Sequence, residues 1–335
     1  MKNGLCLAGG GVKGAAHIGA IKALEEAGIK FDYVGGTSSG SIVACLYACG
    51  FTADEMYDIF KKYCKKIKYV DPINIIKLIL GLIFTRKITI EGLNSGKQIE
   101  KLINKVCYKK GIENITDIKM PLAIPSVSLE SGNVICFTSC EFRNKTSDNT
   151  IFINDIEIGK AVRASCSYPV VFAPCTYKNS KLVDGGIREN VPWKELKFLG
   201  ADNVLSIMFE EKGNVVKDKN LVEIASRSIN LLCRELSNYE MQGEDNIIRI
   251  KSGKVGLLDM SKIDELYQLG YEETKKYCQR GRCLMAKNCQ EGHSFLATNK
   301  IGTNGKRPKM SLVFLIYFKS FFFRIVISWC CIFLF

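Results

Sequence analysis

The sequence predicts an α/β protein built around a mainly parallel sheet, because strand-like and helix-like segments alternate from its first residues. Residues 4–8 form a short apolar run that ends in three glycines, and residues 15–27 then place apolar side chains at helical spacing. Residues 31–35 and 41–49 repeat this strand–turn–helix order. The length of 335 residues suits one large α/β domain with an appendage.

The rest of the chain continues the same mixture of elements. Residues 52–67 read as an amphipathic helix, with Thr52 and Glu55 at the spacing of a capping box. Further helices are expected at residues 91–107, 221–241 and 261–278, and strands at residues 121–128, 133–139 and 203–209.

Residues 73–84 (INIIKLILGLIF) form the most apolar stretch of the predicted body. Twelve residues are too few to cross a bilayer core of about 30 Å as a helix. The first interpretation is therefore a buried helix, and a lid that faces lipid is the alternative.

The net charge of +13 is concentrated at the C-terminus. Residues 278–335 contain nine Lys or Arg and one acid, Glu291. No stripe of basic residues with interleaved aromatics marks a nucleic-acid-binding face, so we expect no nucleic-acid partner.

The fifteen cysteines are scattered from Cys6 to Cys331 and include no C-x-x-C pair. This pattern predicts reduced, mostly buried thiols in a cytoplasmic protein, with no metal and no cofactor. The N-terminal run also lacks the apolar core of a signal peptide.

The character of the sequence changes after Cys278. We expect a catalytic domain over residues 1–278, a polar linker over 279–311 and an apolar tail over 312–335. The tail is long enough to cross a bilayer, but Lys319 and Arg324 interrupt it. A membrane tail, an interfacial segment and an aberrant, frameshifted end all remain open.

Gly36-Thr37-Ser38-Ser39-Gly40 is a G-x-S-x-G sequence between a predicted strand and a predicted helix. A nucleophile elbow requires this context, because the serine must project from a tight turn above the sheet. The flanking glycines Gly36 and Gly40 let the strand and the helix approach each other.

A glycine loop, Gly9-Gly10-Gly11-Val12-Lys13-Gly14, follows the first strand. Its backbone N–H groups are suited to an oxyanion, as acyl transfer requires. Gly9, Gly11 and Gly14 also match a dinucleotide-binding fingerprint, with Asp32 as the ribose ligand. That alternative leaves the Ser38 elbow unexplained and places Asp32 at the start of its strand.

The chain contains two histidines, and neither is well placed to activate Ser38. His17 lies inside the first predicted helix and His293 lies in the polar segment. Although Ser38, Asp184 and His293 follow the order of an α/β-hydrolase triad, a single strand precedes the elbow where those enzymes have several. Asp184, which ends a short apolar run before Gly185 and Gly186, is the candidate base.

Taken together, these motifs resemble the patatin-like phospholipases. The resemblance rests on LAGGGVKGAAHIGAIKALEE, GGTSSG and VDGG, with AVRASCSYPVVFAP before the last motif, and its motif core covers residues 4–200. It implies a three-layer α/β/α sandwich and calcium-independent hydrolysis of lipid acyl esters by a Ser–Asp dyad through an acyl-enzyme.

The resemblance carries roles to individual residues. Ser38 is the expected nucleophile and Asp184 the expected base, while Gly10, Gly11 and Ser39 supply the oxyanion hole. Gly9, Lys13, Gly14, Gly36, Gly40, Gly185 and Gly186 support the motifs. Lys13 and Arg163 are candidates to contact a lipid phosphate; a loop-steadying Lys13 and an ion-paired Arg163 are the alternatives.

The expected partner is lipid at a membrane surface, with the apolar tail as a route to membrane association. A catalytically weak membrane-associated protein on the same fold is the alternative function, and a dinucleotide-binding oxidoreductase is the third. The residues do not indicate the lipid head group, the acyl position or the oligomeric state.

Overall fold

The structure is a computed structural model. It describes residues 1–64, 69–141, 146–147, 149–210, 221–242, 244, 246–253, 255–256 and 259–280. The chain divides into two units, Met1–Glu291 and Gly292–Phe335, and every described residue belongs to the first. The expected linker beyond Arg280, His293 and the apolar tail therefore lie outside the described residues.

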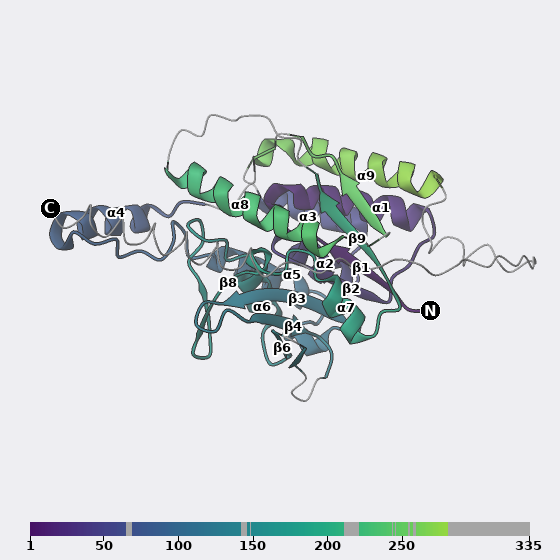
Figure 1. Ribbon diagram of the computed structural model, residues 1–335, viewed down its shortest axis with the longest axis horizontal. Coiled ribbons are helices and arrows are strands. Elements are labelled where there is room, and N and C mark those ends of the chain that lie inside the picture. The colour runs from purple at the N-terminus through teal and green to yellow at the C-terminus, as the bar shows by residue number, and fades with distance from the viewer. Residues whose placement is uncertain are drawn as a thin grey trace, which may run out of the picture. The chain divides into compact units, whose positions relative to one another are not determined.

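The helices and strands that the sequence predicts are present, together with others that it did not indicate (Figure 1). The strands are β1 (Asn3–Leu7), β2 (Tyr33–Gly36), β3 (Leu122–Ser128), β4 (Val134–Thr138), β5 (Thr146–Ser147), β6 (Thr150–Ile153), β7 (Cys175–Tyr177), β8 (Ser180–Asp184), β9 (Asn203–Phe209) and β10 (Ile247–Ile250). The α-helices are α1 (Gly14–Glu26), α2 (Ser39–Ala48), α3 (Ala53–Cys64), α4 (Pro72–Leu80), α5 (Lys97–Tyr108), α6 (Ile158–Ser165), α7 (Trp193–Leu199), α8 (Leu221–Glu240) and α9 (Ile263–Gln279). Short helical turns are η1 (Gly11–Lys13), η2 (Gly81–Thr85), η3 (Ile115–Asp117), η4 (Gly185–Ile187) and η5 (Met260–Lys262).

The described strands form one sheet in the order β10-β9-β1-β2-β3-β4-β6-β5. The four successive pairs from β10 to β3 are parallel, as is the pair of β4 with β6, whereas β3 and β4 are antiparallel. The antiparallel hairpin of β7 and β8 joins the sheet through β3. The predicted α/β fold with a mainly parallel sheet is confirmed.

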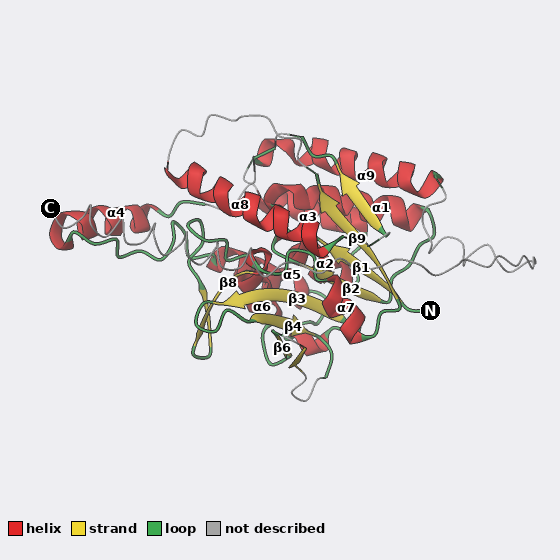
Figure 2. Cartoon of the chain, in the orientation of Figure 1, coloured by secondary structure: helices red, strands yellow, loops and turns green. Residues whose placement is uncertain are grey.

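Helices cover both faces of the sheet (Figure 2). In β1, Leu5 and Leu7 pack into the larger core with α1, α2, α5 and α6, whereas Cys6 and Ala8 pack into a second core with α7. Because successive side chains of a strand point to opposite faces, this alternation places β1 in the middle layer of three. The α/β/α sandwich implied by the family resemblance is present.

The prediction of a buried helix at residues 73–84 is wrong. The structure forms α4 and the π-helical turn η2 there, and no residue of α4 is buried. An apolar segment of this length can form either a buried helix or an exposed one, so the composition alone did not distinguish the two. None of the described helices combines the length and the apolar character needed to cross a membrane.

The last described helix, α9, packs against α1 through two glycines. A Cβ atom at Gly19 would lie 1.9 Å from the backbone O of Tyr267, and one at Gly270 would lie 1.9 Å from the backbone O of Ala16. The two backbones therefore touch at a distance that only glycine permits at these positions.

We expect Gly270→Ala to lower the free energy of unfolding by about 3 kcal/mol, because α9 must move away from α1 to accommodate a methyl group. Urea denaturation measures the difference. Gly256→Ala is the matched control, because the nearest atom to its added Cβ is 3.9 Å away. Equal losses in the two variants would contradict this account of α9.

Candidate active site

Ser38 occupies a strained turn between β2 and α2. Its backbone has φ 52° and ψ −123°, a region that residues other than glycine rarely occupy. A Cβ at Gly36 would lie 2.3 Å from the backbone O of Gly40, and a Cβ at Gly40 would lie 2.3 Å from the O of Leu7. Only glycine fits at either position, so the spacing of the G-x-S-x-G sequence is set by backbone contact.

Hydrogen bonds hold this elbow in place from several directions. The Ser38 N–H donates to Ser165 Oγ at 3.0 Å, and the Ser38 carbonyl accepts from Ser41 Oγ at 2.6 Å. Thr37 donates its N–H to the Leu7 carbonyl at 3.1 Å and its hydroxyl to the Glu189 carbonyl at 2.8 Å. A strained residue persists when its surroundings determine its conformation in this way.

Asp184 is the last residue of β8, which pairs with β3 so that Asp184 lies opposite Ser126. Its N–H donates to the Ser167 carbonyl at 3.0 Å, and its Oδ1 accepts from the Gly186 N–H at 2.8 Å. The side chain is buried, and Oδ2 completes no hydrogen bond of good geometry with any described residue. Asp184 Oδ2 is therefore a hydrogen-bond acceptor in a site that solvent does not reach.

Burial raises the pKa of the Asp184 carboxyl from 3.8 to about 6. The Ser38 hydroxyl and the Gly186 N–H act in the opposite direction, by stabilising the carboxylate. Asp184 is thus a stronger base than an exposed aspartate and is still ionised at neutral pH.

The glycine loop lies beside Ser38. A Cβ at Gly9 would lie 3.2 Å from the Ser38 Cβ, and the Gly9 N–H donates to Asn190 Oδ1 at 3.0 Å. By contrast, the N–H groups of Gly10, Gly11 and Ser39 donate to none of the described residues. These are the three donors that the sequence assigned to an oxyanion hole, and they remain available to a ligand.

His17 is a buried residue whose contacts indicate a structural role. Its Nε2 donates to the Ala8 carbonyl at 2.7 Å, and its ring packs on Phe209 with centroids 4.6 Å apart. Burial lowers its pKa to about 4, so the imidazole is neutral. His17 therefore stabilises the end of β1 and does not serve as the partner of Ser38.

Arg163 and Lys13, the two candidate phosphate contacts, also interact with groups of the protein itself. Arg163 is buried and donates to the Ser95 carbonyl at 2.6 Å and 3.2 Å and to the Pro174 carbonyl at 3.3 Å, with Glu100 at 3.8 Å. Lys13 is buried with its Nζ 5.8 Å from the centre of the Phe209 ring. These surroundings favour the structural alternatives that the sequence left open.

The dinucleotide alternative fails on the position of Asp32. Its carboxylate accepts a hydrogen bond from the Asn3 N–H at 2.8 Å, at the start of β1, whereas the glycine loop follows the end of β1. A ribose ligand would have to lie at the same edge of the sheet as the glycine loop.

Two residues that position the site were not singled out from the sequence. Ser165, at the end of α6, accepts the Ser38 N–H, and Asn190, after η4, binds the Gly9 N–H. Asn190 also donates from Nδ2 to Ser237 Oγ of α8 at 3.1 Å. Their partners lie more than a hundred residues away in the sequence, so no local pattern identifies them.

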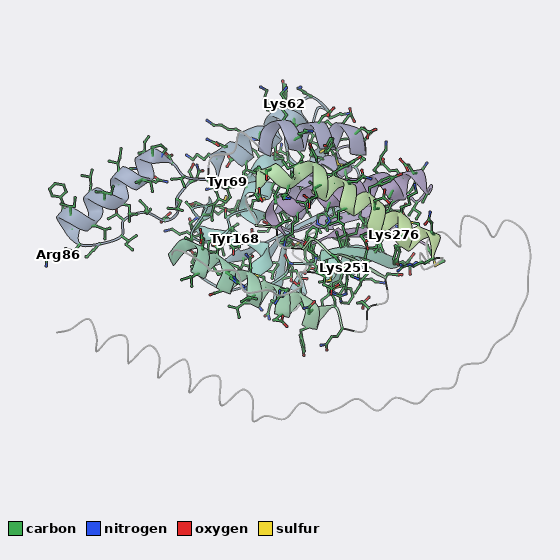
Figure 3. All side chains as sticks on the ribbon, turned by 90° about the horizontal axis from the view of Figure 1, so that it is seen from above. Lys62, Tyr69, Arg86, Tyr168, Lys251 and Lys276 are labelled. Atoms are coloured by element: carbon green, nitrogen blue, oxygen red, sulfur yellow. The ribbon has the colours of Figure 1, made fainter. Side chains whose placement is uncertain are left out.

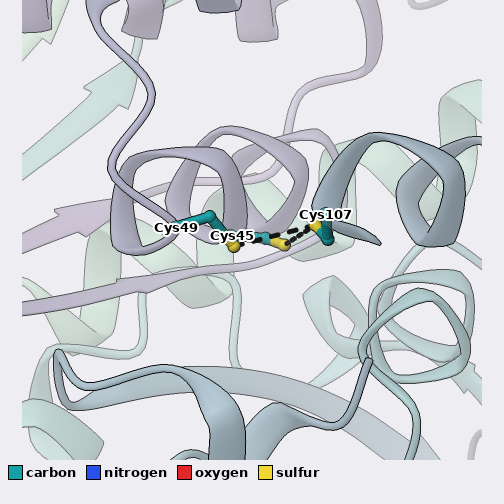
Figure 4. Close-up of side chains that lie close together, drawn as sticks. All are labelled: Cys45, Cys49 and Cys107. Atoms are coloured by element: carbon teal, nitrogen blue, oxygen red, sulfur yellow. Dashed lines mark hydrogen bonds between the residues drawn. The ribbon is translucent and has the colours of Figure 1, made fainter. Parts of the chain in front are cut away.

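The described residues include one group of side chains with the composition of a soft-metal site. Cys45 and Cys49 of α2 and Cys107 of α5 place their sulfur atoms within 4.8 Å of one another (Figure 4). The Cys107 sulfur is 3.8 Å from that of Cys45 and 3.7 Å from that of Cys49. All three side chains belong to the larger core, so their evident role is packing between α2 and α5.

The model of the patatin-like phospholipase family matches residues 5–197. This chain belongs to that family. The match includes the glycine loop, the elbow and the Asp184 turn, and it confirms the resemblance that these motifs indicated.

The curated relatives of this patatin-like chain are much longer proteins. Lysophospholipase nte1 of Emericella nidulans is 27% identical over 308 residues, which cover 83% of this chain and 18% of that protein. Lysophospholipase NTE1 of Lodderomyces elongisporus is 30% identical over 207 residues, which cover 61% of this chain and 12% of that protein. The chain thus spans less than a fifth of the length of these relatives.

Similar solved structures are bacterial proteins. The crystal structure of VipD from Legionella pneumophila superposes with a TM-score of 0.47 and 17% identity, covering 83% of this chain and 67% of that one. ExoU in its complex with SpcU, from the type III secretion system of Pseudomonas aeruginosa, has a TM-score of 0.42 and 17% identity, covering 85% and 53% of the two chains.

We expect Asp184→Asn to stabilise the fold at neutral pH. The pKa of about 6 in the folded protein exceeds the unfolded value of 3.8, so ionisation of Asp184 costs stability progressively as the pH rises between these values. Above the upper value the full cost is about 3 kcal/mol, and the variant should recover up to that amount. Urea denaturation near pH 7.5 and near pH 4 measures it; an equal gain at both values would refute the buried-charge account.

Proposed function

We propose that this chain is a serine hydrolase that cleaves acyl esters of lipids, with Ser38 as nucleophile and Asp184 as base. The observation that carries the proposal is the pairing of a strained, glycine-flanked Ser38 with the buried Asp184 carboxylate, whose Oδ2 completes no hydrogen bond of good geometry with any described residue. Membership of the patatin-like phospholipase family supports lipid esters as the substrate class.

In the first step, Ser38 Oγ attacks the ester carbonyl carbon while its proton passes to Asp184 Oδ2. The carbonyl oxygen becomes an oxyanion, which the N–H groups of Gly10, Gly11 and Ser39 stabilise. Ser39 is the first residue of α2, so the positive end of that helix adds to this stabilisation.

The intermediate then collapses, the bond to the alcohol oxygen breaks, and the proton on Asp184 passes to the departing alcohol. An acyl group remains on Ser38 Oγ. Water attacks this ester in the second half of the cycle, with Asp184 again taking the proton and returning it to Ser38 Oγ. Asp184 suits both directions of transfer because its pKa of about 6 lies close to neutral pH.

The surroundings of Asp184 suit an apolar substrate. Burial raises the pKa of Tyr168 and of Cys233 on α8, to about 12 for Cys233, and the negative charge of Asp184 adds to both shifts, so both groups are neutral. The Tyr168 hydroxyl donates to the Ser226 carbonyl of α8 at 2.7 Å. An acyl chain can lie against such neutral groups without removing water from a charge.

Lysophospholipids are the first substrate class to examine, because the curated relatives are named as lysophospholipases. Separation of the products from lysophospholipid, diacyl phospholipid and neutral lipid would identify the ester that is cleaved. Release of fatty acid by the wild-type chain and its absence with Asp184→Asn would assign the reaction and the base together.

Labelling with a fluorophosphonate tests the nucleophile. We expect the wild-type chain to be labelled and Ser38→Ala not to be labelled, because the probe forms a covalent bond with an activated serine oxygen. Ser39→Ala is the matched control, since it retains the backbone N–H that the mechanism uses. Equal labelling of Ser38→Ala would reject Ser38, and an unlabelled wild type would favour a non-catalytic protein on the same fold.

The pH dependence of ester hydrolysis tests the base. Since Asp184 must be ionised, kcat/KM should fall about tenfold for each pH unit below its pKa of about 6 and level off above it. Glu195→Gln is the control, because burial also raises the pKa of Glu195, to about 7, at a position on α7. If the pH profile of kcat/KM shifted in Glu195→Gln, the ionisation that controls activity would belong to Glu195 and not to Asp184.

A further inference from the structure

Residues 71–94 leave the body of the protein and return to it, and we call this segment the arm. It consists of α4, the turn η2 and a returning chain that ends beside the start of α4. Figure 1 shows α4 extending from the body, and Figure 3 shows Arg86 at the far end of the arm, with Tyr69 at the end that joins the body.

Large apolar side chains of the arm are exposed. Phe84 is 78% exposed, Ile88 71% and Ile83 66%. Ile73, Ile76, Ile79, Leu80 and Leu82 are each about half exposed or more. Such a cluster on one segment is unusual for a protein surface and marks a site of interaction.

The arm has a defined internal structure. Asp71 caps α4 by accepting the Ile73 N–H at 3.0 Å. A Cβ at Gly81 would lie 2.8 Å from the backbone O of Lys87, so the returning chain packs closely on the turn. The exposed apolar side chains are therefore held together on a folded hairpin.

The base of the arm is attached to the segment that positions the active site. Asn74 donates to the carbonyls of Gly92 and Leu93 at 3.2 Å and 3.3 Å, which closes the base. Leu93 and Asn94 then donate their N–H groups to Val170 and Val171 at 3.1 Å and 2.9 Å.

The chain around residues 165–173 therefore contacts the arm and both proposed catalytic residues. Its Ser165 hydroxyl accepts the Ser38 N–H, and its Ser167 carbonyl accepts the Asp184 N–H. Arg163, which precedes this segment on α6, donates to the carbonyl of Ser95, the residue that follows the arm. The arm is thus fixed to the active site by a short series of hydrogen bonds.

The charges of the arm identify its partner. Lys77, Arg86 and Lys87 are the charged residues between Pro72 and Ile90, a stretch without Asp or Glu. The two acids of the arm lie at its base, where Asp71 caps α4 and Glu91 pairs with Lys181. Long basic side chains reach lipid phosphates while neighbouring apolar side chains enter the acyl region. In a two-fold dimer formed through this stretch, by contrast, both copies would bring the same three cations and no acid into the interface.

We propose that the arm inserts Ile83, Phe84 and Ile88 into an anionic lipid bilayer and so docks the active site on the membrane. This inference rests on the proposed hydrolase function and deepens it: the substrate would be lipid in a bilayer, not lipid dispersed in water. Binding itself requires no catalysis, so the two proposals can fail separately.

Flotation of the full chain with vesicles tests the proposal. Ile83→Asp/Phe84→Asp should weaken binding to vesicles of phosphatidylcholine and phosphatidylglycerol by at least about tenfold, because two apolar side chains lose their burial and two negative charges are added. Leu129→Asp is the matched control, since Leu129 is 56% exposed on the turn between β3 and β4. Both sets of residues are exposed, so thermal unfolding should be unchanged.

Hydrolysis separates docking from catalysis. The double variant should hydrolyse a soluble short-chain ester at the wild-type rate and vesicle lipid at least about tenfold more slowly. If the wild-type chain bound vesicles through the arm but hydrolysed no ester, the docking proposal would stand and the hydrolase proposal would be rejected. Equal flotation of the double variant and wild type would overturn the docking proposal. It would also be overturned if the double substitution converted a dimer to a monomer without loss of vesicle binding, because the arm would then be a dimer interface.

A tryptophan probe measures insertion directly. Phe84→Trp should gain blue-shifted emission with vesicles and be quenched by lipids brominated on the acyl chain, because its ring lies below the head groups. Spectra of the parent chain, which has two tryptophans, supply the background. Emission that is unchanged by vesicles would overturn insertion.

Discussion

The first turn of α2 lies so close to the ends of β1 and β2 that no side chain fits between them, and the active site depends on this contact. Gly36 and Gly40 permit the approach, and Ser38, between them, is forced to a positive φ. That conformation points Ser38 away from the strand and starts a helix directly after it. In the proposed mechanism, the same arrangement of backbone sets the oxyanion donors and the position of Asp184.

Polar groups from distant parts of the chain maintain this costly turn. Ser165 of α6 fixes the Ser38 N–H, and Asn190 fixes the glycine loop. The Gly186 N–H and the Ser38 hydroxyl stabilise the carboxylate of Asp184, but burial outweighs both and raises its pKa. A single aspartate in such surroundings has a pKa close to that of the histidine used as base in many serine hydrolases, which is why the proposed mechanism requires no histidine.

The segment around residues 165–173 connects features that are separate in the sequence. It touches the elbow, the strand that ends in Asp184 and the base of the arm. Arg163 belongs to this connection, because its guanidinium binds carbonyls on both sides of it. A buried cation that was a candidate for lipid phosphate is instead part of the framework.

The sequence was sufficient to identify the fold class and the motifs, because their geometry is local. A strand, a glycine-flanked serine and a helix in succession permit one arrangement of backbone, and the scarcity of histidine directed attention to Asp184. Strands β3 and β4 and the helices α5, α8 and α9 followed from periodicity in the same way.

Features that depend on distant partners could not be obtained from the sequence. Whether residues 73–84 are buried depends on what the rest of the fold places beside them, and the structure leaves them exposed. The roles of Ser165, Asn190 and Arg163 follow from contacts across long stretches of chain. By itself, the sequence determined which residues carry the motifs, since a short turn encodes its own geometry; the tertiary structure decided burial, basicity and exposure, since these depend on the packing of segments far apart in the chain.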